Sequence, residues 1–332
     1  MINNLIDDFL GFLSSSKGAS ENTVKEYYYD LRTFIRFILI RREIVKDIEF
    51  KNIDIDLITL DIIKSIRKED IYAFTSFLDR KLKNSNRTKN RKLSSIRTFF
   101  KYLSTKVDLI EYNPAEDIDS PKIERSLPIY LDLDEAMLIL KEISNSEKQP
   151  KFKFRDYAIV TLFLNCGMRL SELSSLNLND IKTNILRVTG KGRKQREIFL
   201  NNACRKALDD YLKVRPDIDN EDALFLSMRN NRMNNRSIQH MVEKYIKNSG
   251  LDTNKYTVHK LRHTAATLMY QYGSADIRSL QEILGHESVS TTQIYTHVNN
   301  KALKDTIESN PLSNINYTEV DDSAENNDKY FK

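Results

Sequence analysis

Cysteine is scarce in this chain of 332 residues, which holds only Cys166 and Cys204. Two thiols cannot supply a four-ligand zinc site or a framework of disulfides. Both lie among apolar or helical-looking residues, where cysteine behaves as a small hydrophobic side chain. We therefore expect both to be reduced and structural.

Long apolar runs are also missing, since no stretch approaches the roughly 18 residues of a membrane span. The first residues, MINNLIDDFLGFL, carry acids where a signal peptide needs bases. We expect a protein of the cytoplasm without membrane contact. With 40% hydrophobic and 30% charged residues, the composition is that of an ordinary globular protein and not of a disordered or fibrous one.

Two signatures of nucleotide and metal chemistry are absent. The stretch TGKG at 189–192 lacks the spacing of the phosphate loop G-x-x-x-x-G-K-[ST], which argues against an ATPase. Aspartate and glutamate are scattered over predicted helix faces and form no acidic triad of the kind that two-metal catalysis needs. We therefore expect no metal and no cofactor.

Positive charge is in slight excess, with 52 Lys and Arg against 47 Asp and Glu and a formal net charge of +5. The excess is compatible with a polyanionic partner. Its distribution says more, because the segment 80–103 is densely basic whereas the tail after Pro311 is acidic. Apolar residues recur in the basic segment at three- and four-residue spacing. We predict a helix with one packed side and one side that offers cations, although a merely solvated face is the simpler alternative.

The length favours two domains, and the segment NPAEDIDSPKIERSLP at 113–128 has three prolines in a charged context. Such a segment is typical of an extended linker. We predict a small helical domain at 1–112, a linker at 113–128, a larger domain at 129–310 and an acidic tail at 311–332 that is either flexible or docked.

Helical periodicity is clear in the first predicted domain. Ser20 is placed to cap a helix over 21–39, and further helices are predicted at 3–13, 65–83 and 88–103. The segment 44–60, rich in Ile and Asp, has weak periodicity and is predicted to be an irregular connection.

The second predicted domain begins with helices at 133–143 and 154–165. The stretch ILRVTGKGRKQREIFL at 185–200 then predicts a β-hairpin with a basic tip, although such a tip is most often a solvated turn. The predicted fold is mainly α-helical with a small β-sheet, an α+β architecture.

A helix is also predicted for HKLRHTAATLMYQYG, which starts at His259. At 100° per residue, His259 and Arg262 share one face at the edge of the core. The next helix, ADIRSLQEIL, ends before Gly285 and leaves His286 just beyond its C-terminus. A further short helix is predicted to carry Tyr295.

These stretches form a set together with GMRLSEL around Arg169 and the GKG hairpin around Lys191. HKLRH at His259, LGH ending at His286 and Tyr295 nine residues later complete it. In order and spacing the set resembles the tyrosine site-specific recombinases of the phage integrase family. The helix over 21–37 and the basic segment ending in FFKYL are similar to the core-binding domain of that family, and the compact two-domain length is similar to its Xer branch.

The resemblance implies that Tyr295 is the nucleophile, which forms a 3′-phosphotyrosyl link to DNA and releases a 5′-hydroxyl. Arg169 and Arg262 would clamp the nonbridging phosphate oxygens, for which a planar, permanently charged guanidinium is suited. Lys191 would be the general acid for the leaving 5′-oxygen.

The resemblance also implies roles for the remaining members of the set. His259 would be a general acid/base or phosphate donor, and His286 would hydrogen-bond the scissile phosphate. Glu172, one helical turn after Arg169, would hold an active-site group in place. His263 and His297 match no catalytic position and are expected to be structural. The candidates for DNA binding are Arg87, Lys89, Arg91 and Lys92 of the basic helix and Arg193 and Lys194 of the hairpin tip.

The partner that the resemblance implies is double-stranded DNA with a specific recombination site. The implied assembly is a homotetramer, or a heterotetramer with a paralogous recombinase. The implied reaction proceeds through a Holliday junction and needs no ATP. The implied role is Xer-like resolution of chromosome or plasmid dimers, linked to chromosome partition and cell division. A mobile-element integrase has the same chemistry, and a type IB topoisomerase would cut one strand as a monomer. A noncatalytic DNA-binding protein would keep the basic first domain but lose part of the site.

Overall fold

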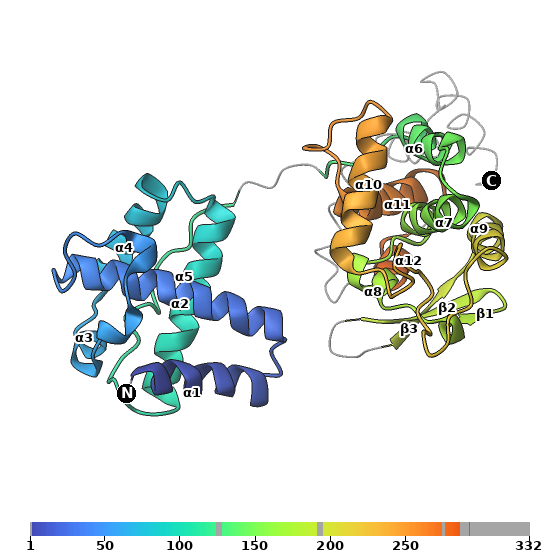
Figure 1. The fold of residues 1–332 in the computed structure, drawn as a ribbon. Coiled ribbons are helices and arrows are strands. Elements are labelled where there is room, and N and C mark those ends of the chain that lie inside the picture. Colours follow the sequence, from blue (N-terminus) through green and yellow to red (C-terminus); the bar gives the residue numbers. More distant parts are fainter. Residues whose placement is uncertain (1, 124–127, 191–194, 274–275, 286–291, 293–332) are drawn as a thin grey trace, which may run out of the picture. The chain divides into compact units, whose positions relative to one another are not determined.

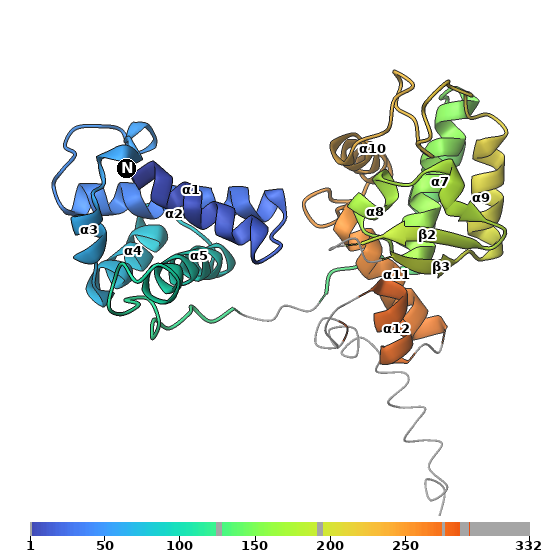
Figure 2. The ribbon, with the colours of Figure 1, turned by 90° about the horizontal axis from the view of Figure 1, so that it is seen from below.

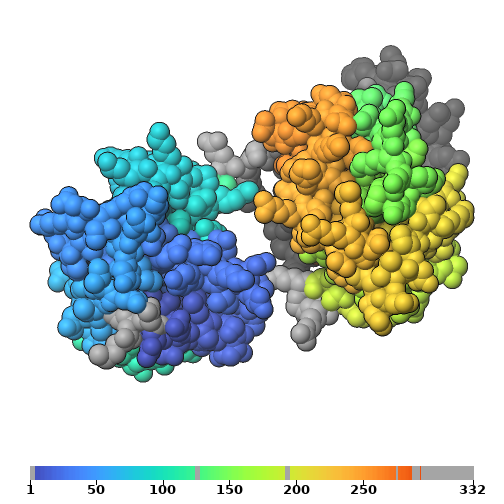
Figure 3. Space-filling model, viewed as in Figure 1, coloured from blue at the N-terminus to red at the C-terminus, as the bar shows by residue number. Residues whose placement is uncertain are grey.

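The computed structural model describes residues 2–123, 128–190, 195–273, 276–285 and 292. The chain divides into two compact units, Met1–Arg125 and Ser126–Lys332, which are taken separately below (Figure 1). Within each unit, side chains close the spaces between the ribbons (Figure 3). No helix of the described ranges combines the length and the apolar character that crossing a bilayer requires.

The described part of the first unit is built from helices. They are α1 (Ile2–Ser15), α2 (Glu21–Arg41), the 3₁₀ turns η1 (Phe50–Asn52) and η2 (Ile55–Leu57), α3 (Leu60–Lys64), α4 (Lys68–Arg80) and α5 (Asn86–Thr105). Ser20 caps α2 as predicted, because its hydroxyl accepts a hydrogen bond from the Thr23 amide at 3.3 Å. The helix predicted over 65–83 begins later, at Lys68, since Ser65 ends α3.

Aromatic rings fill the core of this unit. Phe9 packs edge-on against Phe99 with ring centroids 5.2 Å apart, and Phe34 packs in the same way on Phe74 at 5.1 Å. Edge-to-face pairs of this kind add to the stabilisation that burial provides. The segment 44–60 is irregular as predicted, but it is anchored, because several of its isoleucines are buried in the same core.

The basic helix α5 differs from the prediction. Lys89 and Lys92 are each 8% exposed and do not lie on an open cationic face. Lys92 binds the buried carboxylate of Asp30 on α2 at 3.1 Å, Arg91 binds the same group at 2.7 Å, and Lys89 binds Asp79 on α4. The reason is the packing of α2 on α5, which buries Asp30 completely, and a buried carboxylate requires cations around it. Only Arg87 and Arg91 are exposed among the four candidates.

The buried pairs predict a large loss of stability in Asp30→Ala, because Lys92 would keep its buried charge without a carboxylate. We expect the first unit to lose about 3–5 kcal/mol, measured by hydrogen exchange in α2 and α5 at increasing urea. Asp117→Ala is the matched control, since Asp117 and its partner Lys68 are 73% and 45% exposed, and it should cost at most about 1 kcal/mol. Equal losses in the two variants would contradict the structural role given to Asp30.

The expected linker at 113–128 starts as part of the first unit. Ala115 and Ile118 are buried in its core, and Arg97 of α5 donates to both of their carbonyls, at 3.1 and 2.9 Å. Side chains near the start of α5 hold the next residues in the same way, since Asn90 donates to the carbonyl of Pro121. The residues up to this point therefore lie along α5.

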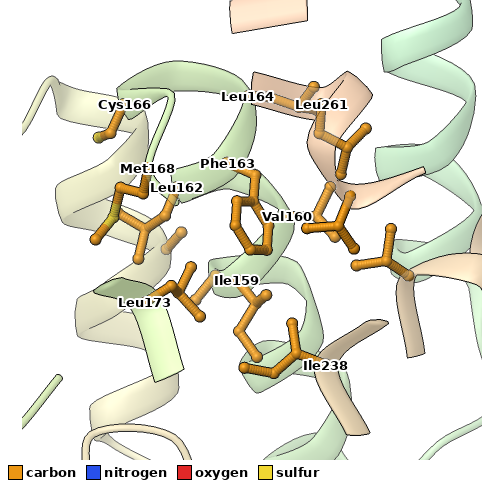
Figure 4. Close-up of a cluster of buried hydrophobic side chains, with 14 of the residues drawn as sticks. Ile159, Val160, Leu162, Phe163, Leu164, Cys166, Met168, Leu173, Ile238 and Leu261 are labelled. Atoms are coloured by element: carbon orange, nitrogen blue, oxygen red, sulfur yellow. The ribbon is translucent and has the colours of Figure 1, made fainter. Parts of the chain in front are cut away.

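The second unit surrounds a central helix, α7 (Pro150–Cys166). It also contains α6 (Leu133–Asn145), α8 (Leu170–Ser174), η3 (Leu178–Asp180), α9 (Asn202–Leu212), α10 (Asn235–Asn248), α11 (Val258–Tyr272) and α12 (Ile277–Leu284). Helix α7 is buried on most of its surface because α6, α9 and α11 pack around it. Figure 4 shows this core, in which Phe163 lies between Leu261 of α11 and Ile159 on the preceding turn of α7.

The predicted hairpin is present and belongs to a three-stranded antiparallel sheet of order β1-β2-β3. Strands β2 (Ile185–Thr189) and β3 (Gln195–Phe199) pair from Ile185 opposite Phe199 to Thr189 opposite Gln195. The two-residue strand β1 (Ile181–Lys182) was not predicted. The fold class is confirmed as mainly helical with a small sheet.

The two cysteines lie in the core of the second unit. Cys166 and Cys204 are free and buried, as expected, with their sulfur atoms 3.6 Å apart. The hydrogen bond with Cys204 and the burial of the thiol raise the pKa of Cys166 well above its usual range. The thiol of Cys166 therefore stays protonated at neutral pH, and both side chains are buried away from reagents in solution.

Candidate active site

The loop that carries Arg169 is shaped by Gly167, which ends α7 in the left-handed region at φ +58°. A Cβ at this position would come within 2.7 Å of the Leu284 side chain. Glycine therefore lets the loop pass close to the end of α12. The loop then enters α8 with Arg169 as its N-cap and Glu172 in the first turn.

Glu172 is the centre of an ion cluster and is 1% exposed. It accepts hydrogen bonds from the backbone N–H and the Nη1 of Arg169, both at 2.8 Å. Arg196 of β3 donates to both carboxylate oxygens, at 2.5 and 3.0 Å. Burial by itself raises the pKa of Glu172, but the hydrogen bonds from Arg196 and Arg169 outweigh it, so the pKa lies below its ordinary value. Glu172 is thus ionised at neutral pH.

The two candidate arginines meet at the end of α12. Arg169 donates to the carbonyl of Gly285 at 2.6 Å. Arg262 of α11 donates to the carbonyls of Leu284 and Gly167, at 2.7 and 2.6 Å. Figure 2 shows α12 next to α11 and the sheet next to α8. The structure therefore brings Arg169 and Glu172, which are three residues apart, together with Arg262, which lies far from them along the chain.

Arg262 differs from the prediction in its burial. It is 7% exposed and does not lie at the edge of the core, because α11 packs between α7 and α12. His259, three residues earlier in the first turn of the helix, is exposed. The two side chains share a face, but only the histidine is open to solvent.

His263 lies beside this pair and is half-buried. Its burial and the nearby charges of Lys260, Arg262 and His259 lower its pKa to about 4. His263 is therefore neutral at physiological pH.

The remaining residues named from the sequence lie outside the described residues. They are Lys191, Arg193, Lys194, His286, Tyr295 and His297. Their neighbours in the chain are described: the pair Thr189 and Gln195 closes the strands on either side of the hairpin tip, and Gly285 directly precedes position 286. In the described ranges, no three His, Cys, Asp or Glu side chains are grouped as a metal site.

Arg196 belongs to the ion cluster around Glu172 although none of the sequence motifs singles it out. A signal for it existed in the strand QREIF, where burial alternates and Arg196 shares the inward face with the buried Ile198. An arginine on the inward face of a strand needs an acidic partner. The pattern thus pointed to an ion pair, although not to Glu172 as the partner.

Comparisons with known proteins agree over both units. The model of the phage integrase family matches residues 130–302, and that of the phage integrase N-terminal SAM-like domain matches residues 6–106. The tyrosine recombinase XerC of Caldanaerobacter subterraneus subsp. tengcongensis is 49% identical over 93% of this chain and 87% of its own.

Two solved structures show the fold. The XerH site-specific recombinase in a post-cleavage complex with a palindromic difH substrate has a TM-score of 0.69 at 23% identity, covering 92% of this chain and 84% of its own. A lambda integrase tetramer bound to a Holliday junction has a TM-score of 0.63 at 19% identity, covering 87% and 78%.

Proposed function

This chain belongs to the phage integrase family and is a tyrosine recombinase, an enzyme that cuts and rejoins DNA strands, and we propose that it recombines a specific DNA site as the Xer recombinases do. The alternatives with the same chemistry, a mobile-element integrase and a type IB topoisomerase, are not favoured by its similarity to XerC. The proposed role is the resolution of chromosome or plasmid dimers in the cytoplasm, in support of chromosome partition and cell division.

The observation that carries the proposed site is the convergence of Arg169 and Arg262 on the end of α12. A phosphodiester under attack gathers negative charge on its nonbridging oxygens, and fixed N–H donors stabilise that charge. Arg169 presents five donors and its side chain is 34% exposed. Its bonds to Glu172 and Gly285 use two of them, so others are available to a phosphate.

The reaction that we propose exchanges one ester for another. The Tyr295 phenolate attacks the phosphorus, the bond to the 5′-oxygen breaks, and Lys191 gives that oxygen its proton. His259 takes the proton of the tyrosine or donates a hydrogen bond to the phosphate, and His286 hydrogen-bonds the phosphate. A 5′-hydroxyl of a second strand then reverses the step, and no ATP is consumed because the number of phosphate esters is unchanged.

For the DNA contacts, we propose the exposed Arg87 and Arg91 of α5 together with Arg193 and Lys194. Lys89 and Lys92 support this surface indirectly, because their ion pairs with Asp79 and Asp30 hold α5 against α4 and α2. The working assembly is a tetramer on two duplexes, either of this chain alone or with a paralogous recombinase. The lambda integrase tetramer on a Holliday junction supports this proposal as a relative of the same fold.

A synthetic four-way junction tests recombination against simple relaxation of DNA. Its arms would carry the site recovered by sequencing the genomic fragments that the protein retains. We expect labelled strands to be exchanged in EDTA and without ATP, since the proposed charge clamp consists of side chains. A protein that leaves the junction intact and relaxes supercoiled plasmids without the site would act as a topoisomerase instead.

A further inference from the structure

Arg196 connects three parts of the active site that come from different elements. It is the second residue of β3, the strand that follows the hairpin tip, and reaches both oxygens of Glu172 on α8. Its side chain is 17% exposed. The contact is thus a buried, bidentate pair, a geometry that fixes both direction and distance.

The same side chain lies against the backbone of Gly285. A Cβ built on Gly285 would be 3.0 Å from Nη1 of Arg196 and 3.1 Å from its Cδ and Cζ. The carbonyl of Gly285 is the acceptor for Arg169 at 2.6 Å. Arg196 therefore binds the carboxylate that holds Arg169 and lies beside Gly285, the residue whose carbonyl accepts from Arg169.

The charges of the ion cluster indicate how the contact between Arg196 and Glu172 would affect the reaction. If Glu172 had Arg169 as its sole partner, the carboxylate would orient the guanidinium and also cancel its positive charge. With Arg196 bound to the same carboxylate, two cations share one anion and a net positive charge remains. In a site of low dielectric such a charge acts strongly on a nearby phosphate.

We propose that Arg196 is a positioning residue for strand cleavage. It neutralises Glu172, so that the carboxylate can orient Arg169 without cancelling the charge that Arg169 offers to the phosphate. It also ties the base of the hairpin that carries Lys191 to the end of α12. The proposal rests on the proposed role of Arg169 as a phosphate clamp.

The test measures DNA affinity and cleavage rate in Arg196→Met. This variant keeps most of the aliphatic part of the side chain and removes its charge. On a duplex nicked near the cleavage point, we expect a single-turnover cleavage rate about 100-fold lower, comparable to the loss of one donor to the reacting oxygens. DNA affinity should change less than about threefold, because Arg196 acts through Glu172. Arg196→Lys keeps the charge without the planar fork and should recover part of the rate.

A double-mutant cycle with Glu172→Gln separates the positioning role from a direct one. We expect Arg196→Met to slow cleavage by less than about threefold in the Glu172→Gln background, since the carboxylate through which it acts is gone. Arg205→Met is the matched control, because Arg205 also makes a bidentate pair, with Asp209 on α9, at 3.1 and 2.6 Å. That variant should cleave at the wild-type rate.

Three outcomes would overturn the proposal. The first is a wild-type cleavage rate in Arg196→Met. The second is a fall in cleavage rate on Arg196→Met that is as large in the Glu172→Gln background as in the wild-type background. The third is a loss of DNA affinity as large as the loss of cleavage rate. Should Arg196→Met not fold, Arg196→Lys decides in the same cycle, where its defect must disappear once Glu172 is Gln. If the wild-type chain and Arg205→Met form no adduct at all, the proposed function itself fails.

Discussion

Tyr295→Phe is expected to abolish the covalent protein–DNA adduct while DNA binding stays unchanged, because the variant lacks only the attacking oxygen. The substrate is a duplex with a nick close to the cleavage point. Attack then releases a short fragment, the 5′-hydroxyl needed for resealing diffuses away, and the adduct accumulates. Wild-type protein should give a band that resists denaturation, in EDTA and without ATP.

Two tyrosines of α11, the helix that carries Arg262, serve as controls for this result. Tyr272 at the end of α11 is 73% exposed, and Tyr270 lies two residues earlier. Phenylalanine at either position should leave the adduct intact. An adduct that persists in Tyr295→Phe, or that maps to another tyrosine by peptide sequencing, would refute the assignment, and a strict requirement for Mg²⁺ would refute the mechanism.

Arg262→Ala is expected to lower the cleavage rate by roughly 10²–10³-fold with DNA binding nearly intact. Arg262→Ala should also lower the stability of the second unit, because the carbonyls of Gly167 and Leu284 would lose a buried hydrogen-bond donor. Each unsatisfied carbonyl costs about 1–3 kcal/mol, so the melting temperature of the second unit should fall as well. Single-turnover cleavage and calorimetry measure the two effects.

Arg169→Ala is compared with Arg262→Ala because the Arg169 side chain is more exposed, at 34%. Its removal should therefore leave fewer buried polar groups without a hydrogen-bond partner. We expect a similar fall in cleavage with a smaller change in melting temperature. Wild-type cleavage in either variant would remove that arginine from the proposed site. Equal destabilisation in both would instead contradict the difference in burial.

Local patterns predicted the hairpin and most helices of the described residues, but not α3, α8, α9 and α10. Ser20 could be recognised as a cap because capping depends on residues within one turn. The strands β2 and β3 could be recognised from β-branched residues on either side of a turn. The order and spacing of the motifs likewise identified Arg169, Glu172 and Arg262 as members of one set.

Long-range ion pairs were what the sequence could not reveal. Lys92 is buried because α2 brings Asp30 to it across 62 positions of the chain, and no periodicity within α5 carries that information. Arg196 was missed for the same reason, since its partner Glu172 lies 24 positions away on another element. A charged residue on a predicted inward face can be noticed, but its partner depends on the packing of the whole unit.

The buried pair Cys166 and Cys204 has a practical consequence for experiments in solution. The two residues are 2% and 0% exposed, and alkylating dyes react with accessible thiolates. A cysteine introduced at an exposed position of each unit can therefore carry a fluorophore while both native cysteines remain in place. Energy transfer between two such dyes would report how the distance between the units changes when DNA is added.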